Sequence, residues 1–208
     1  MASQVLICKM ALSHIGSEAT IVSIDPPDGS VEAGYCETYY DAVRAELLES
    51  GNWAFSLARE ELAQNAVNPS PNWAYSYALP SDCLRPLRVI RQGYSIVFGN
   101  EDYEPTDADG APFEIEGSSL YTNEPLALLV YVVDVTDTTK FTPSFVSAFS
   151  YLLASYLAGP IIKGNEGTRV GDAMRQIAMQ KALASATASA NGSTEVRDFE
   201  PASIRARR

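Results

Sequence analysis

The 208-residue sequence predicts an α+β fold, in which a helical bundle built from both chain ends accompanies an antiparallel β-rich middle domain and an extended C-terminal arm. Apolar residues recur every three or four positions near both ends, as on one face of a helix. In the middle, aromatic and β-branched residues alternate between turns that contain proline or glycine. The residues after Ala190 show little apolar periodicity, which indicates an arm.

Two helices are expected in the N-terminal part. The first runs from Ser3, a candidate N-cap, to Gly16, which suits the position after a helix end. The second follows the turn-rich residues 25–30, ends near Ser50 and is closed by Gly51. Each helix carries an apolar stripe, formed by Ile7, Ala11 and Ile15 in the first and by Cys36, Tyr40, Val43 and Leu47 in the second.

The expected strands lie in the middle of the chain. Trp73, Tyr75, Tyr77 and Leu79 alternate along one candidate, and the others span residues 87–91, 94–98, 112–116, 120–122 and 127–135. Residues 117–119 (Gly-Ser-Ser) predict a hairpin connection. The run 126–133 is apolar on both faces, so we expect a central strand there.

Two further helices are expected near the C-terminus. Thr142 and Pro143 suit the N-cap and first position of a largely buried helix, which Gly159-Pro160 should end or kink. The last helix should run from about Thr168 to Ala190. These elements predict a discontinuous helical domain of residues 1–52 and 140–191, a β-rich domain of residues 53–139 and an arm of residues 192–208.

Charge is distributed unevenly along this chain of net charge −11. No Lys or Arg lies between Arg91 and Lys140, so this interval cannot neutralise phosphates as a nucleic-acid site would. The interval is predicted to form a solvated acidic face or the wall of a channel. The candidate residues for this surface are Glu101, Asp102, Glu104, Asp107, Asp109, Glu114 and Glu116.

The three cysteines are widely separated and show no zinc-binding spacing. We expect Cys8 and Cys36 to be buried in helices as small apolar residues, in a reduced chain that assembles in the cytoplasm. No run of about 18 apolar residues is expected, and the N-terminus does not resemble a signal peptide. The sequence therefore predicts no membrane association.

The residues offer little for catalysis. A Ser-His or Cys-His nucleophile needs an imidazole, and the single histidine, His14, is interpreted as a packed or surface side chain. Neither a P-loop nor a dinucleotide fingerprint is present. Residues 105–116 partly match a calcium loop, but the first position is Pro105, so an acidic turn is favoured. We predict no enzyme activity, no metal and no cofactor.

Paired carboxylates are the remaining catalytic option, because a glycosidase needs only two of them. Glu60 and Glu61 would point to opposite faces of a strand, whereas Glu114 and Glu116 would share a face about 7 Å apart. Solvated glutamates are the favoured interpretation of both clusters.

Several motifs, taken in order, resemble the tail tubular protein A family of short-tailed bacteriophages. The resemblance covers most of residues 5–163. It includes Ala11-Leu12-x-x-Ile15-Gly16, Cys36-x-x-x-Tyr40-x-x-x-Arg44, Trp53-Ala54-Phe55, residues 73–85 (WAYSYALPSDCLR), residues 131–134 (YVVD), Phe141-x-Pro143-x-Phe145 and residues 153–161 (LASYLAGPI).

The resemblance implies a structural virion protein, a subunit of a twelve-fold ring between the portal and the tail nozzle, with tail fibres as further partners. DNA would pass through the ring without specific binding, and an acidic wall would repel it. The resemblance also implies that the C-terminal arm contacts the portal or a neighbouring subunit, for which Arg205, Arg207 and Arg208 are the candidates.

Two other functions stay open. The first is a virion-associated hydrolase of glycan or peptidoglycan that uses Glu114 and Glu116. The second is a soluble cytoplasmic binding module that has no relation to virions and would be a monomer or a small oligomer.

Overall fold

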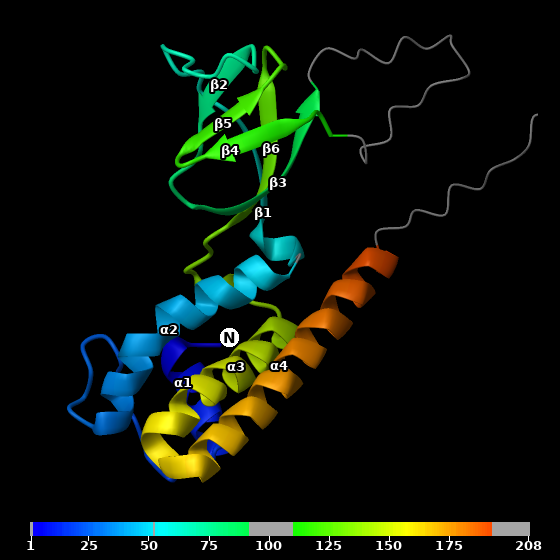
Figure 1. The fold of residues 1–208 in the computed structure, drawn as a ribbon. Helices are drawn as coiled ribbons and strands as arrows, with labels where there is room; N and C mark the ends of the chain where they lie inside the picture. The colour runs from blue at the N-terminus through cyan, green and yellow to red at the C-terminus, as the bar shows by residue number, and fades with distance from the viewer. Residues whose placement is uncertain (1, 52, 92–109, 193–208) are drawn as a thin grey trace, which may run out of the picture.

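The computed structural model describes residues 2–51, 53–91 and 110–192 (Figure 1). In these ranges the chain forms four α-helices and two three-stranded antiparallel sheets, so the predicted α+β class is confirmed. Figure 1 shows the helices gathered at one end of the molecule and both sheets at the other. The helices are α1 (Gln4–His14), α2 (Val31–Ser50), α3 (Pro143–Ile162) and α4 (Gly164–Gly192). The strands are β1 (Leu57–Glu61), β2 (Tyr75–Ala78), β3 (Cys83–Arg91), β4 (Phe113–Glu116), β5 (Ser119–Thr122) and β6 (Ala127–Val133).

The helix ends follow the capping residues that the sequence predicted. Ser3 caps α1 by accepting a hydrogen bond from the Leu6 amide, and Thr142 caps α3 by accepting one from the Phe145 amide. After α1, Gly16 adopts a φ of +73°, a conformation that favours glycine. The amide of Ser17 then reaches back to the Leu12 carbonyl, which completes the cap.

The bounds of α3 and α4 differ from those suggested by the sequence. α3 continues past Pro160 to Ile162, because a proline this close to a helix end removes few backbone hydrogen bonds. α4 begins at Gly164 instead of near Thr168, and it extends to Gly192, one residue into the predicted arm. Lys163, with a φ of 63°, is the single residue between the two helices.

α3 also corrects the expectation that the chain has no long apolar run. By length and composition the helix could cross a membrane, since its mean hydropathy is 1.6. More than half of that window, 56%, is buried inside the protein, as expected for the central helix of a bundle. The two phenylalanines Phe145 and Phe149 are fully buried at its N-terminal half.

The sheets confirm the predicted central strand. β6 lies between β1 and β3, while β5 lies between β2 and β4. Residues 117 and 118 connect β4 to β5 as a tight hairpin, and Gly117 has a φ of +60°. No bounds were predicted for β1, although Glu60 and Glu61 were treated as neighbours in a strand. β3 begins four residues before the expected start at Leu87, with irregular pairing around Pro86. The expected strand 94–98 lies outside the described residues.

Two hydrophobic cores fill the described part of the chain. The larger one contains the buried faces of all four helices together with Trp53 and Val132. The smaller one lies between the sheets and includes Tyr77, Leu120 and Tyr131. β6 contributes to both cores, because Val132 packs on the helices and Tyr131 packs within the sheets.

Candidate functional site

An ion pair connects the helices to the sheet. Arg44 lies on α2 with only 5% of its surface exposed, and Asp134 follows β6 directly. The Nε and Nη2 atoms of Arg44 donate to the two carboxylate oxygens of Asp134, each over 3.1 Å. Arg44 also pairs with Asp41 on its own helix. These hydrogen bonds favour the charged form, so the pKa of Arg44 lies above its usual value despite the opposing effect of burial.

An aromatic cluster occupies the same junction. Trp53 and Phe55, which precede β1, contact the ring of Phe145 on α3 edge-on, at centroid distances of 4.9 and 5.1 Å. Phe141 lies 4.7 Å from Phe145 and 5.7 Å from Phe55. The indole N–H of Trp53 donates to the Leu47 carbonyl, which ties the cluster to α2. The cluster therefore fixes the chain where it enters and leaves the sheets.

The motifs that resemble tail tubular protein A meet at this junction. Arg44 and Asp134 come from two of those motifs and are 90 residues apart. Trp53 and Phe55 come from a third motif, and Phe145 comes from a fourth. These motif residues therefore stabilise the fold, and their described contacts assign them no catalytic role.

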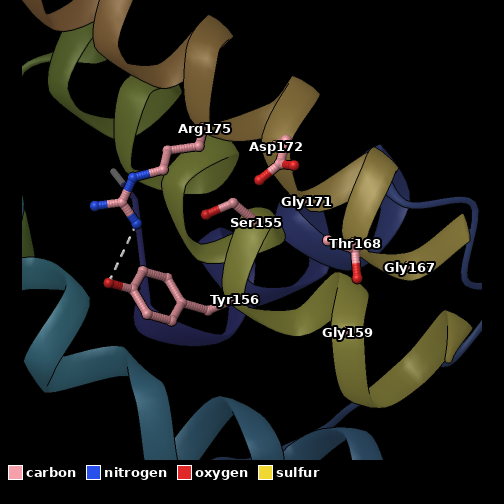
Figure 2. A pocket seen from close by; sticks show the side chains of 8 residues that line it. All are labelled: Ser155, Tyr156, Gly159, Gly167, Thr168, Gly171, Asp172 and Arg175. Carbon is pink, nitrogen blue, oxygen red and sulfur yellow. Dashed lines mark hydrogen bonds between the residues drawn. The ribbon is translucent and has the colours of Figure 1, made fainter. Parts of the chain in front are cut away.

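A shallow cavity of about 270 Å³ lies between α3 and α4 (Figure 2). Close packing of the helices shapes it, since a Cβ on Gly167 or Gly171 would lie 2.9 Å from a carbonyl oxygen of α3. The lining residues are Ser155, Tyr156, Gly159, Gly167, Thr168, Gly171, Asp172 and Arg175.

Polar and charged side chains at one end of this cavity bind one another. The Tyr156 hydroxyl donates to Glu46 over 2.6 Å, and Arg175 donates to the same carboxylate over 2.5 Å. Figure 2 shows Arg175 reaching from α4 to the Tyr156 hydroxyl, a distance of 3.4 Å. The three side chains thereby join α2, α3 and α4, so their geometry serves bundle packing.

The two described members of the acidic candidate set lie on β4. Glu114 and Glu116 are exposed, and Glu114 accepts a hydrogen bond of 2.7 Å from the indole of Trp73. This bond anchors the loop before β2 to the neighbouring hairpin. Neither glutamate lines the cavity between α3 and α4.

A second pair of carboxylates was not foreseen from the sequence. Glu60 on β1 and Asp82, just before β3, both lie within hydrogen-bonding distance of the Tyr131 hydroxyl, at 3.1 and 3.3 Å. Burial and these acceptors raise the pKa of Tyr131. The two carboxylates are 22 positions apart in the sequence, and only the pairing of β1 and β3 with β6 brings them together.

His14 and Ser150 form the pair that most resembles a catalytic dyad. Their side chains are 3.1 Å apart, but Ser150 is fully buried and donates to the Ser147 carbonyl. The imidazole stacks on Tyr151 at 3.8 Å. A buried hydroxyl cannot reach a substrate, so the pair packs α1 against α3. Among the described residues, no group of three or more His, Cys, Asp or Glu side chains is arranged to hold a metal ion.

The other predicted site residues lie outside the described residues. They are Glu101, Asp102, Glu104, Asp107 and Asp109 of the acidic set and Arg205, Arg207 and Arg208 of the arm.

No protein-family model and no curated protein matches the chain. The relation to the tail tubular protein A family stays a prediction that depends on the ordered motifs.

Proposed function

We propose that this chain is a structural virion protein, a ring-forming head-to-tail adaptor that connects the portal to the tail nozzle of a short-tailed bacteriophage. It would be assembled in the host cytoplasm and would form part of the channel for DNA ejection. The proposal includes no enzyme activity and no cofactor. The observation that carries it is the meeting of separate adaptor-like motifs at one junction, through Arg44 and Asp134 and through Trp53, Phe55 and Phe145.

A ring subunit needs such a junction for a geometric reason. In a closed ring of twelve copies each subunit is rotated by about 30° from the next through a heterologous contact, so an angular error in one subunit is repeated at every interface. The helices and the sheet must then keep a fixed relative position. The buried Arg44 ion pair and the edge-on aromatic contacts supply that constraint.

The acidic interval supports a place on the DNA path. A channel for DNA must not bind it, and carboxylates repel phosphates at short range. Glu114 and Glu116 are the described members of this set and are exposed on β4. We propose that this face lines the central hole. If Glu114→Lys and Glu116→Lys leave DNA ejection unaffected in reconstituted particles, this placement is wrong.

Electron microscopy of the purified chain mixed with purified portal rings tests the central proposal. We expect a ring of twelve copies on the portal face that would receive the tail. Images in which the portal stays bare while the chain remains a monomer or small oligomer would favour the binding module instead.

A variant of the C-terminal arm gives a matched comparison. Replacing Arg205, Arg207 and Arg208 with Gln should weaken attachment to the portal, because charge-assisted contacts are lost. Replacing Lys163, which lies between α3 and α4, with Gln is the control and should leave attachment unchanged. Equal attachment of the arginine variant and the wild type would remove the arm from the proposal.

The hydrolase alternative has a separate test. Purified chain would be added to cell walls and glycan substrates, alongside a Glu114→Gln, Glu116→Gln variant. The adaptor proposal predicts no clearing by either protein. Clearing by the wild type that the variant loses would establish the enzyme.

A further inference from the structure

The cavity between α3 and α4 is open space beside a close contact of the two helices. Gly167 and Gly171 are buried, and a Cβ on either would lie 2.9 Å from a carbonyl oxygen of α3. A Cβ on Gly159, which also lines the cavity, would meet nothing within 4 Å. The glycines of α4 therefore bring the helices together, while the glycine of α3 leaves room for another group.

Arg175, the cation among the described lining residues, is already bound within the protein. Its Nη2 atom donates to Glu46 over 2.5 Å, and its Cζ atom lies 5.7 Å from the centroid of the Tyr156 ring. Figure 2 shows the guanidinium turned away from Asp172 and toward the Tyr156 hydroxyl. The positive charge of the lining is thus balanced by Glu46, which leaves Arg175 poorly placed to bind an anion in the cavity.

Asp172 gives the lining a negative charge that is not balanced in this way. The arginines three residues before and after it on α4, Arg169 and Arg175, pair with Glu166 over 2.7 Å and with Glu46 over 2.5 Å. In the ranges that the structure describes, the Asp172 carboxylate itself forms no ion pair. The cavity therefore favours a cation over an anion.

Two hydroxyl oxygens line the cavity together with this carboxylate. Ser155 donates its hydroxyl proton to the Leu152 carbonyl over 2.6 Å, so its oxygen can still accept a hydrogen bond. Thr168 lies four residues before Asp172 and hence on the same face of α4. These oxygens are all acceptors, so the lining suits a positively charged group that has several N–H donors.

We propose that this cavity binds a guanidinium group, carried by an arginine side chain or by free arginine. A guanidinium is planar and can place two parallel N–H donors on one carboxylate, here that of Asp172, with further donors left for Ser155 and Thr168. The cavity volume of about 270 Å³ is below the roughly 300–1,000 Å³ of sites for drug-sized ligands, so it suits one side-chain-sized group. The inference does not depend on the adaptor proposal.

An NMR titration of the full, isotope-labelled chain tests the site. The probe is Nα-acetyl-L-arginine methylamide, which carries a guanidinium and no charged terminus. We expect saturable shifts in the amide signals of residues 155–175. The matching lysine compound should bind more weakly, because an ammonium cannot make the planar bidentate contact. Inorganic phosphate should leave these signals unchanged. Shifts that never saturate and spread over the whole surface would overturn the proposal, since they would show unspecific attraction to a chain of net charge −11.

Three full-length variants separate the cavity from its charge. Asp172→Asn, at an exposed position, should weaken binding of the arginine compound by about tenfold or more, because a charge-assisted bidentate contact is lost. Gly159→Leu keeps the charge but places a side chain in the open space, so it should block binding. Glu37→Gln removes a charge from an exposed position on α2 and should bind like the wild type. Thermal midpoints check that each variant is folded. Wild-type affinity in Asp172→Asn would overturn the proposal.

A second titration identifies the source of the guanidinium. The peptide of residues 201–208 (PASIRARR) is an arginine-rich segment of the chain itself. Tighter binding of this peptide than of the arginine compound, lost in Asp172→Asn, would indicate an arginine side chain from another copy of the chain. Equal binding of the two would indicate free arginine, and binding of neither would overturn the site. These readouts need no portal and no ring. Failure here leaves the adaptor proposal intact, and bare portals in the microscope leave the guanidinium site intact.

Discussion

The Arg44 guanidinium on α2 and the Asp134 carboxylate after β6 are joined by two hydrogen bonds of 3.1 Å each, across 90 residues of sequence. The side chain of Asp134 is 29% exposed, while that of Arg44 is only 6% exposed. The arginine is therefore a nearly buried cation, and acceptors at the junction offset the cost of removing its charge from water.

Replacing Asp134 with Ala should lower the free energy of unfolding by about 2 to 3 kcal/mol, since a buried cation then loses its bidentate partner. Asp41 remains as a second partner of Arg44, but it is mostly exposed and compensates little. Chemical denaturation measures the change. Glu37→Ala, at an exposed position of α2, is the control and should change the value by less than about 0.5 kcal/mol. A result for Asp134→Ala as small as the control would contradict the structural role of the pair.

Alanine substitutions at Gly51 and Gly34 should have opposite effects on stability. A Cβ on Gly51 would lie 2.6 Å from the indole nitrogen of Trp53, which donates to the Leu47 carbonyl over 2.9 Å. Gly51→Ala should displace the indole and cost about 1 to 3 kcal/mol. Gly34 lies within α2 with open space around it, so Gly34→Ala should stabilise the protein by about 0.5 to 1 kcal/mol. Thermal unfolding of both variants measures the difference in stability between them. Equal destabilisation by both substitutions would show that the contact with Trp53 does not cause the effect of Gly51→Ala.

Local features of this fold could be predicted from the sequence, and long-range ones could not. Ser3, Gly16 and Thr142 act on neighbouring residues, so their capping roles followed from position alone. The bounds of β1 were not predicted because its sequence, LAREE, is mostly exposed and becomes a strand only through pairing with β6.

The long-range contacts of the candidate site could not be predicted from the sequence either. Two sets of contacts depend on how the sheets and helices pack, and no spacing in the sequence encodes them. They are the contact of Arg44 with Asp134 and the contacts of Glu60 and Asp82 with the Tyr131 hydroxyl. The ordered motifs did identify the residues of the junction, but they did not indicate which of those residues would touch. The resemblance itself stays a prediction.

Removing the hydroxyl group from Tyr40 and from Tyr156 should change the free energy of unfolding in opposite directions. The Tyr40 hydroxyl is buried and has no hydrogen-bond partner among residues 2–51, 53–91 and 110–192. Tyr40→Phe should therefore raise the free energy of unfolding by about 1 kcal/mol, because an unsatisfied polar group leaves the core. Tyr156→Phe should lower it by about 1 kcal/mol, since its hydroxyl donates to Glu46 and accepts from Arg175. Urea denaturation of the two variants is the measurement, and a loss of stability in Tyr40→Phe would indicate a partner for that hydroxyl.

His14 should make stability depend on pH between about pH 5 and 7. Burial first, and the positive charge of Lys181 second, lower the pKa of His14 below its usual 6.5, so the folded state binds a proton less readily than the unfolded state. The stability associated with the neutral ring is fully present above pH 6.5 and is lost as the pH falls below that value. Protonation also places a cation against the Tyr151 ring on which Lys181 already lies, at 5.3 Å.

His14→Gln keeps a group that can bond the Ser150 hydroxyl but cannot take up a proton in this range. Denaturation curves collected from pH 5 to 7.5 should therefore show a smaller loss of stability in the variant than in the wild type as the pH falls. Lys181→Gln should also reduce the loss of stability that occurs as the pH falls, because one of the two causes of the lowered pKa of His14 is removed. Parallel curves for wild type and His14→Gln would mean that carboxylates elsewhere, and not the stacked imidazole, govern stability in this interval.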